Sequence, residues 1–391
     1  MMKKDRLLHI PQVDIWLLLI VLVLMIIGTA VMYSASSYTA ETKENNSEYF
    51  LQNHLIRIAV GFMLMFIAAI VPYQFWLGLS PIFYGLSLLM LFVLLFRIPP
   101  AFEANGSWRW LRIGPVIFQP SDFSRYALIL LLARVLKEKQ GLLKKFSGGY
   151  LKLLLLVAAV ALPVALEKDL GTALIIMLIG LLMFYFAEAR SSYLLAISSS
   201  IATVGFAYMM RTPYQQKRVV DFLNSIVHNV EPVWQVKQSL ISLAQGGLIG
   251  QGIGNSRQKY EFLPEAHKDF IFSILGEEAG FLGAILVLVL FCLLIRRGII
   301  IARQAPDGYG LLLAGGITVC IGCYALINIA VSLGLLPTTG IPMPFFSYGG
   351  SSHVTHIAAI GLLLNISSQG QKAYANYFGW STYKDRLARF S

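Results

Sequence analysis

The sequence contains little charge and little cysteine, and both shortages narrow the class of protein. Only 13% of the 391 residues are charged and 57% are hydrophobic, whereas soluble chains contain about 25% charged residues. A water-soluble enzyme is excluded, and so is a disordered chain, which needs much charge and few apolar residues. The three cysteines lie within apolar runs, which excludes a disulfide scaffold. We therefore expect a membrane protein that crosses the bilayer several times.

Motifs for nucleotides are missing as well. The sequence has no G-x-x-x-x-G-K-[ST] loop, and the glycine-rich run at 245–254 lacks the lysine of such a loop, which favours a re-entrant or surface turn. We therefore expect no nucleotide cofactor. The net charge of +11 does not indicate a nucleic-acid partner, because short basic loops between apolar segments are typical of attraction to a lipid surface.

Ten apolar segments approach the length of about 20 residues that a helix needs to cross a bilayer. They cover residues 13–32, 55–71, 75–96, 121–136, 149–166, 170–187, 192–210, 269–295, 309–334 and 350–367. No small-residue cleavage site follows the first segment, which favours a retained helix over a removed signal peptide. The predicted fold class is all-α, a polytopic membrane protein with about ten transmembrane helices and one long extracytoplasmic loop at 210–268.

Lysine and arginine predict the orientation. With a cytoplasmic N-terminus, 17 of the 31 basic residues lie on the cytoplasmic side, seven lie in loop 210–268 and seven lie elsewhere outside. Loops near or above about 60 residues are translocated across the membrane regardless of charge, so the long loop is left out of the count. The remaining excess of lysine and arginine, 17 inside against seven outside, places both termini in the cytoplasm. The predicted organisation is a cytoplasmic N-terminus (1–14), one membrane domain (15–367) and a cytoplasmic C-terminal tail (368–391). The loops with unusual polar chemistry then face outward.

Ionisable residues near membrane depth are candidate functional residues, because a charge in lipid costs several kcal/mol. Asp122 and Arg125 stand three residues apart at a predicted helix start and can pair on one face. Arg109 and Arg125 together suit an anionic headgroup. A capped helix beside an interfacial tryptophan belt explains the same segment equally well, and Trp108 alone is best explained by that belt.

Two more clusters carry carboxylates. The turn at 167–172 holds three charges between apolar runs, and capping by Asp169 accounts for only part of them, which favours a polar cavity. Asp269 opens a long apolar segment, where a carboxylate also suits the helix dipole. Glu277 and Glu278 lie about two turns further on. They cannot be caps, and we expect them to need partners such as the basic residues of the other clusters.

These motifs resemble those of one known family. The segments are NGSWRW with QPSD, EKDLGT, LPEAHKDFIFSILGEEAG and LGLLPTTGIPMPFFSYGGSS. In this order they resemble the SEDS family (shape, elongation, division and sporulation) over roughly residues 12–367, and the third segment looks more like the division branch than the elongation branch. The last segment is rich in proline and glycine and predicts non-helical backbone at the membrane edge.

The resemblance implies a function outside the bacterial cytoplasmic membrane. The family polymerises lipid II, the undecaprenyl-pyrophosphate-linked disaccharide-pentapeptide, into the glycan strands of peptidoglycan. It works with a class B penicillin-binding protein, which crosslinks the product, and with other division or elongation proteins. Two other classes stay open. A lipid II flippase would need essential charge across the whole span, and a scaffold for the penicillin-binding protein would need none of the outward charge.

Residue by residue, the resemblance makes Asp269 the essential carboxylate. The resemblance also implies that a substrate cavity is lined by Trp110, Arg109, Lys168, Glu277 and Ser351. To these we add Arg125, the second outward arginine, as a candidate substrate-binding residue. The sequence departs from the family at Lys168, where proline is common, and at His353 and His356, which replace apolar residues. The family commonly has glutamate and lysine at the positions of Asp122 and Arg125, which keeps the charges.

The chemistry of the reaction suits these residues. An α-linked pyrophosphate donor and a β-1,4 product require one inverting displacement, in which a base takes the proton of the acceptor hydroxyl. Pyrophosphate leaves as an anion, so cations assist: Arg109, Arg125, Lys168 or a bound divalent cation, Mg²⁺ or Mn²⁺. Asp269 is therefore either the general base or a metal ligand, and the sequence leaves both roles open.

Overall fold

The computed structural model of the protein describes residues 13–104, 106–114, 116–139, 149–228, 230–260 and 262–378. Most of the predicted N-terminal segment and the last part of the predicted C-terminal tail lie outside these residues. The described chain is mainly helical, which confirms the predicted all-α class.

A helix stands at each of the ten predicted membrane segments, and within the described residues two more α-helices lie between them. In chain order they are α1 (Ile15–Glu44), α2 (Tyr49–Ile70), α3 (Tyr73–Leu95), α4 (Pro120–Glu138), α5 (Leu151–Leu166), α6 (Leu170–Phe186), α7 (Ser191–Arg211), α8 (Pro213–Val227), α9 (Trp234–Gly246), α10 (Ile271–Arg303), α11 (Gly308–Ser332) and α12 (Ser351–Phe378). By length and composition, α1, α2, α3, α7, α10 and α11 can each cross a membrane, and α5 and α6 are shorter apolar helices. The chain is a polytopic membrane protein.

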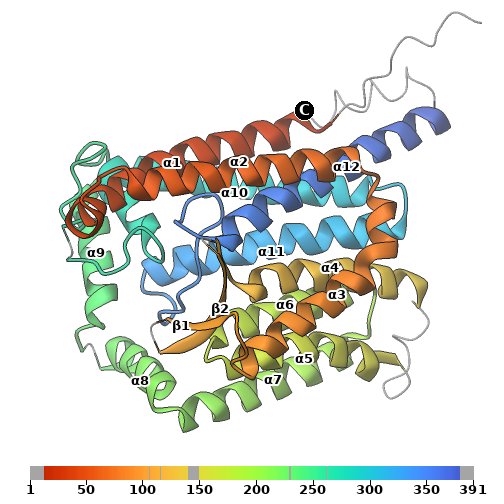
Figure 1. Cartoon of the computed structure of the whole chain (residues 1–391), viewed down its shortest axis with the longest axis horizontal. Helices are drawn as coiled ribbons and strands as arrows, with labels where there is room; N and C mark the ends of the chain where they lie inside the picture. The colour runs from red at the N-terminus through yellow and green to blue at the C-terminus, as the bar shows by residue number, and fades with distance from the viewer. Residues whose placement is uncertain are drawn as a thin grey trace, which may run out of the picture.

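The helices run roughly alongside one another (Figure 1). Helix α11 packs against α10, α4 and α6, while α4 also contacts α3 and α12, so these two helices form the centre. The α4 sequence is the less apolar of the two, and the polar side chains of its first two turns, Ser121, Asp122, Ser124 and Arg125, are nevertheless buried. Helix α7 is the opposite case, because it packs on α6 and α8 and leaves most of its apolar surface open for lipid.

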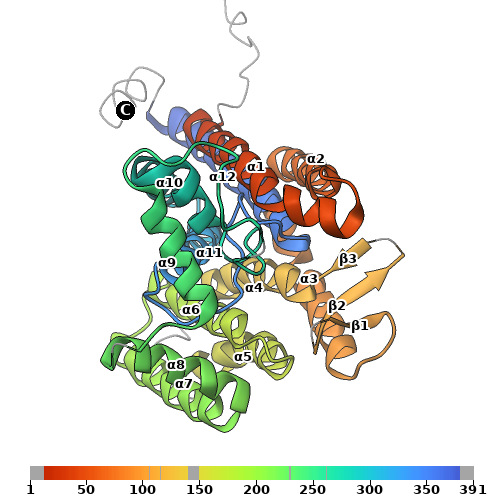
Figure 2. The same cartoon turned by 90° about the vertical axis from the view of Figure 1, so that its left-hand side faces the viewer.

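One end of the bundle carries nearly all of the irregular structure (Figures 1 and 2). We call it the loop end. It comprises α8, α9, the segments 246–270 and 333–350, and an antiparallel sheet of β1 (Ala101–Ala104), β2 (Ser107–Ile113) and β3 (Val116–Phe118). Sequence reasoning missed this sheet. The signal was present, because Asn-Gly and Gly-Pro dipeptides flank the alternating run SWRWLRI.

Helix α10 is broken inside the predicted 269–295 segment. Gly280 has φ 67° and ψ −169°, which is not helical. The glycine-rich segment after α9 closes the break: the N–H of Phe281 donates to the carbonyl of Gly247, and the N–H of Gln251 donates to that of Glu277. A Cβ on Gly250 would stand 2.1 Å from the carbonyl oxygen of Glu278. The glycines therefore permit close backbone packing.

Candidate functional site

Asp269 lies at the loop end, in the segment that enters α10. The helix begins at Ile271, its N-cap is Phe270, and no side chain caps it. The Asp269 side chain is half-buried, and no hydrogen bond or ion pair of its carboxylate is found among the described residues. Helix capping therefore does not account for this carboxylate.

The surroundings of Asp269 make its carboxyl a weaker acid than an ordinary aspartate. Burial raises the pKa of Asp269 to about 6; Glu265 and Asp169 add to the rise, while Lys268 and Arg218 oppose it. One carboxylate oxygen faces Gly340, where an added Cβ would stand 3.7 Å away. Most of the Asp269 side chains are ionised at pH 7 and can accept a proton.

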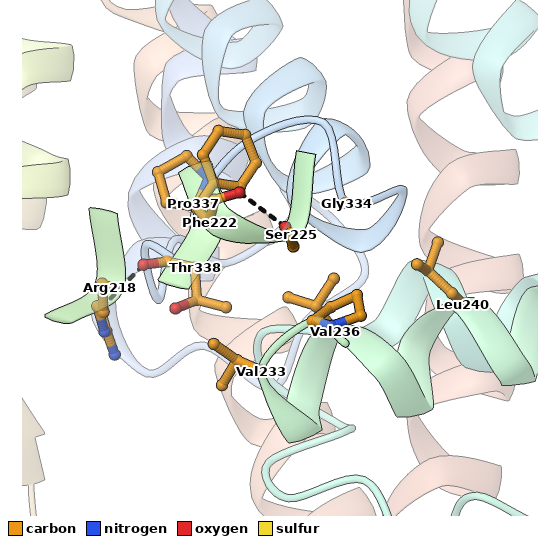
Figure 3. A pocket seen from close by; sticks show the side chains of 10 residues that line it. Arg218, Phe222, Ser225, Val233, Val236, Leu240, Gly334, Pro337 and Thr338 are labelled. Atoms are coloured by element: carbon orange, nitrogen blue, oxygen red, sulfur yellow. Dashed lines mark hydrogen bonds between the residues drawn. The ribbon is translucent and has the colours of Figure 1, made fainter. Parts of the chain in front are cut away.

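A cationic side chain that sequence reasoning did not select approaches from α8. Arg218 donates from Nη1 to the carbonyl of Thr338 over 2.9 Å. Figure 3 shows Arg218 and Thr338 at one side of a cavity that α8, α9 and the 334–338 turn enclose. The walls of the cavity are mainly apolar, with Phe222, Val233 and Leu240 among them. The 334–338 turn thus joins this cavity to the segment that faces Asp269.

Arg109 holds the sheet against the turn between α5 and α6. From β2, its Nε donates to the carbonyl of Glu167 over 3.1 Å, and Nη2 donates to that of Lys168 over 2.5 Å. Its Nη1 lies 3.8 Å from Oδ2 of Asp169. Lys168 reaches back and donates to the carbonyl of Gly106 over 3.2 Å. Two of the three cations predicted for the cavity, Arg109 and Lys168, therefore lie together beside two carboxylates.

The carboxylates of this turn behave differently. Asp169 caps α6 by accepting from the N–H of Thr172 over 3.2 Å, as predicted. Glu167 is buried, and burial, with Asp169 next to it, raises the pKa of its carboxyl to about 8. The turn connects to the Asp269 region through Gly171, where an added Cβ would stand 3.2 Å from Cβ of Thr339.

A second polar group lies deeper, between α4 and α12. Arg125 is 1% exposed, and its Nη1 pairs with Oδ1 of Asp122 over 3.0 Å, which confirms the predicted pair. Its Nη2 donates to Oγ of Ser352 over 2.9 Å. Ser351 donates to Oδ2 of Asp122 over 2.6 Å and accepts from the N–H of Gln119 over 2.9 Å. Arg125 and Ser351 are therefore bound within the protein.

Glu277 and Glu278 are enclosed as well. Oε2 of Glu277 accepts from Ser242 and Ser256 over 2.9 and 2.5 Å, and Oε1 accepts from the N–H of Arg257 over 2.9 Å. Glu278 accepts from Ser34. The expectation of basic partners is not met within the described chain, where hydroxyl and backbone donors take their place.

The remaining predictions concern a tryptophan and a metal ion. Trp110 lies half-buried on β2, opposite Phe102 on β1. Within the described ranges, no three histidine, cysteine, aspartate or glutamate side chains come together to hold a metal ion. Mg²⁺ needs only one or two carboxylates when substrate phosphates supply its other ligands. Among the described residues, Asp269 would therefore serve such an ion as a single ligand, with the substrate supplying the others.

Comparison with known sequences gives consistent matches. The model of the family described as cell cycle protein (FtsW, RodA and SpoVE) matches residues 15–372. A probable peptidoglycan glycosyltransferase FtsW of Geobacter sulfurreducens is 36% identical over 362 residues, which cover 92% of this chain and 96% of the relative. Stage V sporulation protein E of Bacillus subtilis is 38% identical over 357 residues, 90% of this chain and 96% of that protein.

Solved structures agree with these matches. A chain of a peptidoglycan synthase complex, described as coordinating polymerization and crosslinking, superposes with a TM-score of 0.74 at 25% identity, covering 92% of this chain and 98% of that one. The rod shape determining protein RodA of Thermus thermophilus superposes with a TM-score of 0.67 at 26% identity, covering 91% and 96%. The similarity therefore extends over the whole membrane domain.

Proposed function

Because the chain belongs to the cell cycle protein family of FtsW, RodA and SpoVE, we propose that it is a peptidoglycan glycosyltransferase that polymerises lipid II into β-1,4 glycan strands. The observation that carries the proposal is the Asp269 carboxylate. It is half-buried at the loop end, has no partner among the described residues and lies near the cations Lys268 and Arg218. Such a group is available to a substrate, whereas a capping or paired carboxylate is not.

Asp269 acts in this proposal as the general base. It takes the proton of the acceptor sugar hydroxyl while the oxygen attacks the anomeric carbon of the donor, and the bond from that carbon to the pyrophosphate breaks with inversion. Its pKa of about 6 suits this role, because a base is most effective when its pKa lies near the working pH.

The leaving pyrophosphate is stabilised by fixed positive charge. Arg109 and Lys168 from the sheet and the α5–α6 turn, and Arg218 and Lys268 near Asp269, are the cations of the loop end that support this role. The proposal assigns no protein-held metal centre. In the alternative role, Asp269 would hold Mg²⁺ or Mn²⁺ as a ligand in place of acting as the base, and the ion would supply positive charge to the leaving group.

The test is polymerisation of purified lipid II by the purified chain, with and without a class B penicillin-binding protein, which we propose as its partner. We expect glycan strands from the wild type and none from Asp269→Asn. Asp307→Asn is the matched control, because Asp307 caps α11 at the opposite end of the bundle and pairs with Lys137 over 3.5 Å. Polymerisation by Asp269→Asn at the control's rate would contradict the base assignment.

The same experiment separates the other two classes. A flippase would move lipid II across vesicles without producing strands, and a scaffold would bind the penicillin-binding protein with neither activity. Release of strands by the chain alone, with the transpeptidase absent, is the result expected for a polymerase. No strands under any condition, together with lipid II movement, would replace the proposal by the transporter.

We also propose that the loop end faces outward, with both termini in the cytoplasm. In a background without the three native cysteines, His228→Cys after α8 should react with an impermeant thiol reagent in intact cells, because His228 is exposed. Lys372→Cys on the far end of α12 is also exposed and should react only after lysis. The reverse pattern would overturn the orientation and the proposed function with it.

A further inference from the structure

Asn328 occupies an unusual place beneath the candidate site. It lies in α11, one of the two central helices, and its side chain is 1% exposed. Its Nδ2 donates to the carbonyl of Asp269 over 2.9 Å and to the carbonyl of Ile341 over 2.8 Å. One amide group thus ties two separate segments of the loop end to the most enclosed part of the bundle.

The two segments that Asn328 ties are those that face each other at the site. Asp269 carries the carboxylate, and Gly340 is the residue that this carboxylate faces. Gly340 has φ +73°, a conformation in which a side chain would be strained. The spacing between carboxylate and backbone at this point therefore depends on the position of both segments, and Asn328 is bonded to both.

We propose that Asn328 is a positioning residue for Asp269. It acts through the backbone carbonyls of Asp269 and Ile341, and it keeps the Asp269 carboxylate at a fixed place beside Gly340. This inference rests on the proposed function of Asp269 as the base. The residue type is explained by the geometry, because an amide supplies two N–H donors from one nitrogen, whereas an ionised carboxylate of the same shape supplies none.

The kinetic test compares Asn328→Leu and Asn328→Asp with the wild type on lipid II. Misplacement of a reacting group by about 1 Å costs about 10²-fold in rate, so we expect kcat to fall by about 10- to 100-fold while KM changes by less than about threefold. Asn328→Asp has a distinct signature. Its carboxylate faces two carbonyls, and protonation restores one donor, so its activity relative to the wild type should rise as the pH falls.

Asn365 provides the matched control. It is buried in α12 at the other end of the bundle, where its Nδ2 donates to the carbonyl of Ala69 over 2.6 Å and its Oδ1 accepts from the N–H of Tyr73 over 2.9 Å. Asn365→Leu and Asn365→Asp should lower thermal stability and leave kcat per folded molecule close to wild type. Equal losses of kcat at Asn328 and Asn365 would overturn the proposal, because they would indicate general damage to the fold.

Hydrogen exchange of the purified full chain tests whether Asn328 holds the two segments, and it does not depend on a measurement of activity. Asn328→Leu should speed amide exchange in 262–270 and 336–346, and Asn365→Leu should leave both segments unchanged. A wild type that makes no glycan strands would contradict the proposed function, and the exchange result would still decide whether Asn328 holds the two segments. Unchanged exchange in both segments, or an Asn328→Leu enzyme with wild-type kcat, would overturn the inference.

Discussion

The protein contains two groups of charged residues that look alike in sequence and differ in structure. Around Arg125 and Asp122, the guanidinium and the carboxylate pair over 3.0 Å, serines from α12 bind both, and both residues are buried. Around Asp269, the carboxylate is half-buried and has no partner of its own within the described chain. Both groups contain residues that the sequence marked as candidate site residues.

The difference indicates what each group does. A buried ion pair whose members bind each other holds helices in place, and removing one member leaves an uncompensated charge. A carboxylate without a partner contributes little to the fold and can accept a proton or bind a ligand. Charged residues at membrane depth identify both groups in the sequence. Only their hydrogen-bond and ion-pair partners in the structure distinguish a structural role from a catalytic one.

Removal of one member of the buried pair should have the largest effect. We expect Arg125→Leu to lower the free energy of unfolding by about 3–5 kcal/mol, because Asp122 is left buried without its counter-ion. The double variant Asp122→Leu/Arg125→Leu should recover most of this loss. Thermal unfolding in detergent measures it. The comparison fails if Arg125→Leu keeps its stability and loses polymerisation, since Arg125 would then act on the substrate.

Arg109→Ala comes next, because Arg109 has contacts of both kinds. It binds two carbonyls of the α5–α6 turn and lies near Asp169, yet its side chain is still 28% exposed. We expect kcat/KM for lipid II to fall by an amount worth about 1.5–3 kcal/mol, the contribution of a charge-assisted hydrogen bond. The free energy of unfolding of the same variant, measured in parallel, distinguishes substrate binding by Arg109 from support of the fold. An equal loss in stability would make Arg109 a support for the turn.

The pH dependence of polymerisation follows from the base. Because the pKa of Asp269 is raised to about 6, the active ionised form should be lost as the pH falls through this value. We expect a rate that is nearly constant above pH 7 and decreases about tenfold per unit below pH 5. A profile whose acid limb stays near pH 4 would indicate an ordinary aspartate that is open to water.

Lys168→Ala should have the smallest effect. The Lys168 contact to the Gly106 carbonyl is exposed, and exposed ionic contacts contribute about 0–1 kcal/mol. Measured lipid II turnover should fall only a few-fold. A loss as large as that of Arg109→Ala would mean that Lys168 contributes as much as Arg109 to stabilising the pyrophosphate.

Much of the fold could be predicted because apolar runs alone locate membrane helices. All ten predicted segments contain helices, although α1 continues beyond residue 32 to Glu44 and α12 beyond residue 367 to Phe378. The break at Gly280 could not be predicted, because it depends on a glycine-rich segment that lies beside α10 only after folding. The sheet left a readable signal in its turn dipeptides.

The candidate site was only partly readable. Asp269 and Asp169 stood out as charges next to apolar runs. Arg218 did not, because it lies in an amphipathic loop helix next to a second cation, Lys217. Asn328 is the single amide in its apolar run at 309–334, and a buried amide at membrane depth is a usable sign of a specific hydrogen bond. Which carbonyls it would bind depends on the folded chain.

The interruption of α10 at Gly280 also changes how a displacement travels through the molecule. An intact helix behaves as one rod, because its hydrogen bonds run without a gap from end to end. Here the ladder leaves the helix at Glu277 and continues into the segment after α9. The piece of α10 before Gly280 is bonded through Glu277 to Ser256 and Arg257, so we expect a displacement of this piece to reach the chain that leads to Asp269 before it reaches the longer piece of α10 beyond Gly280.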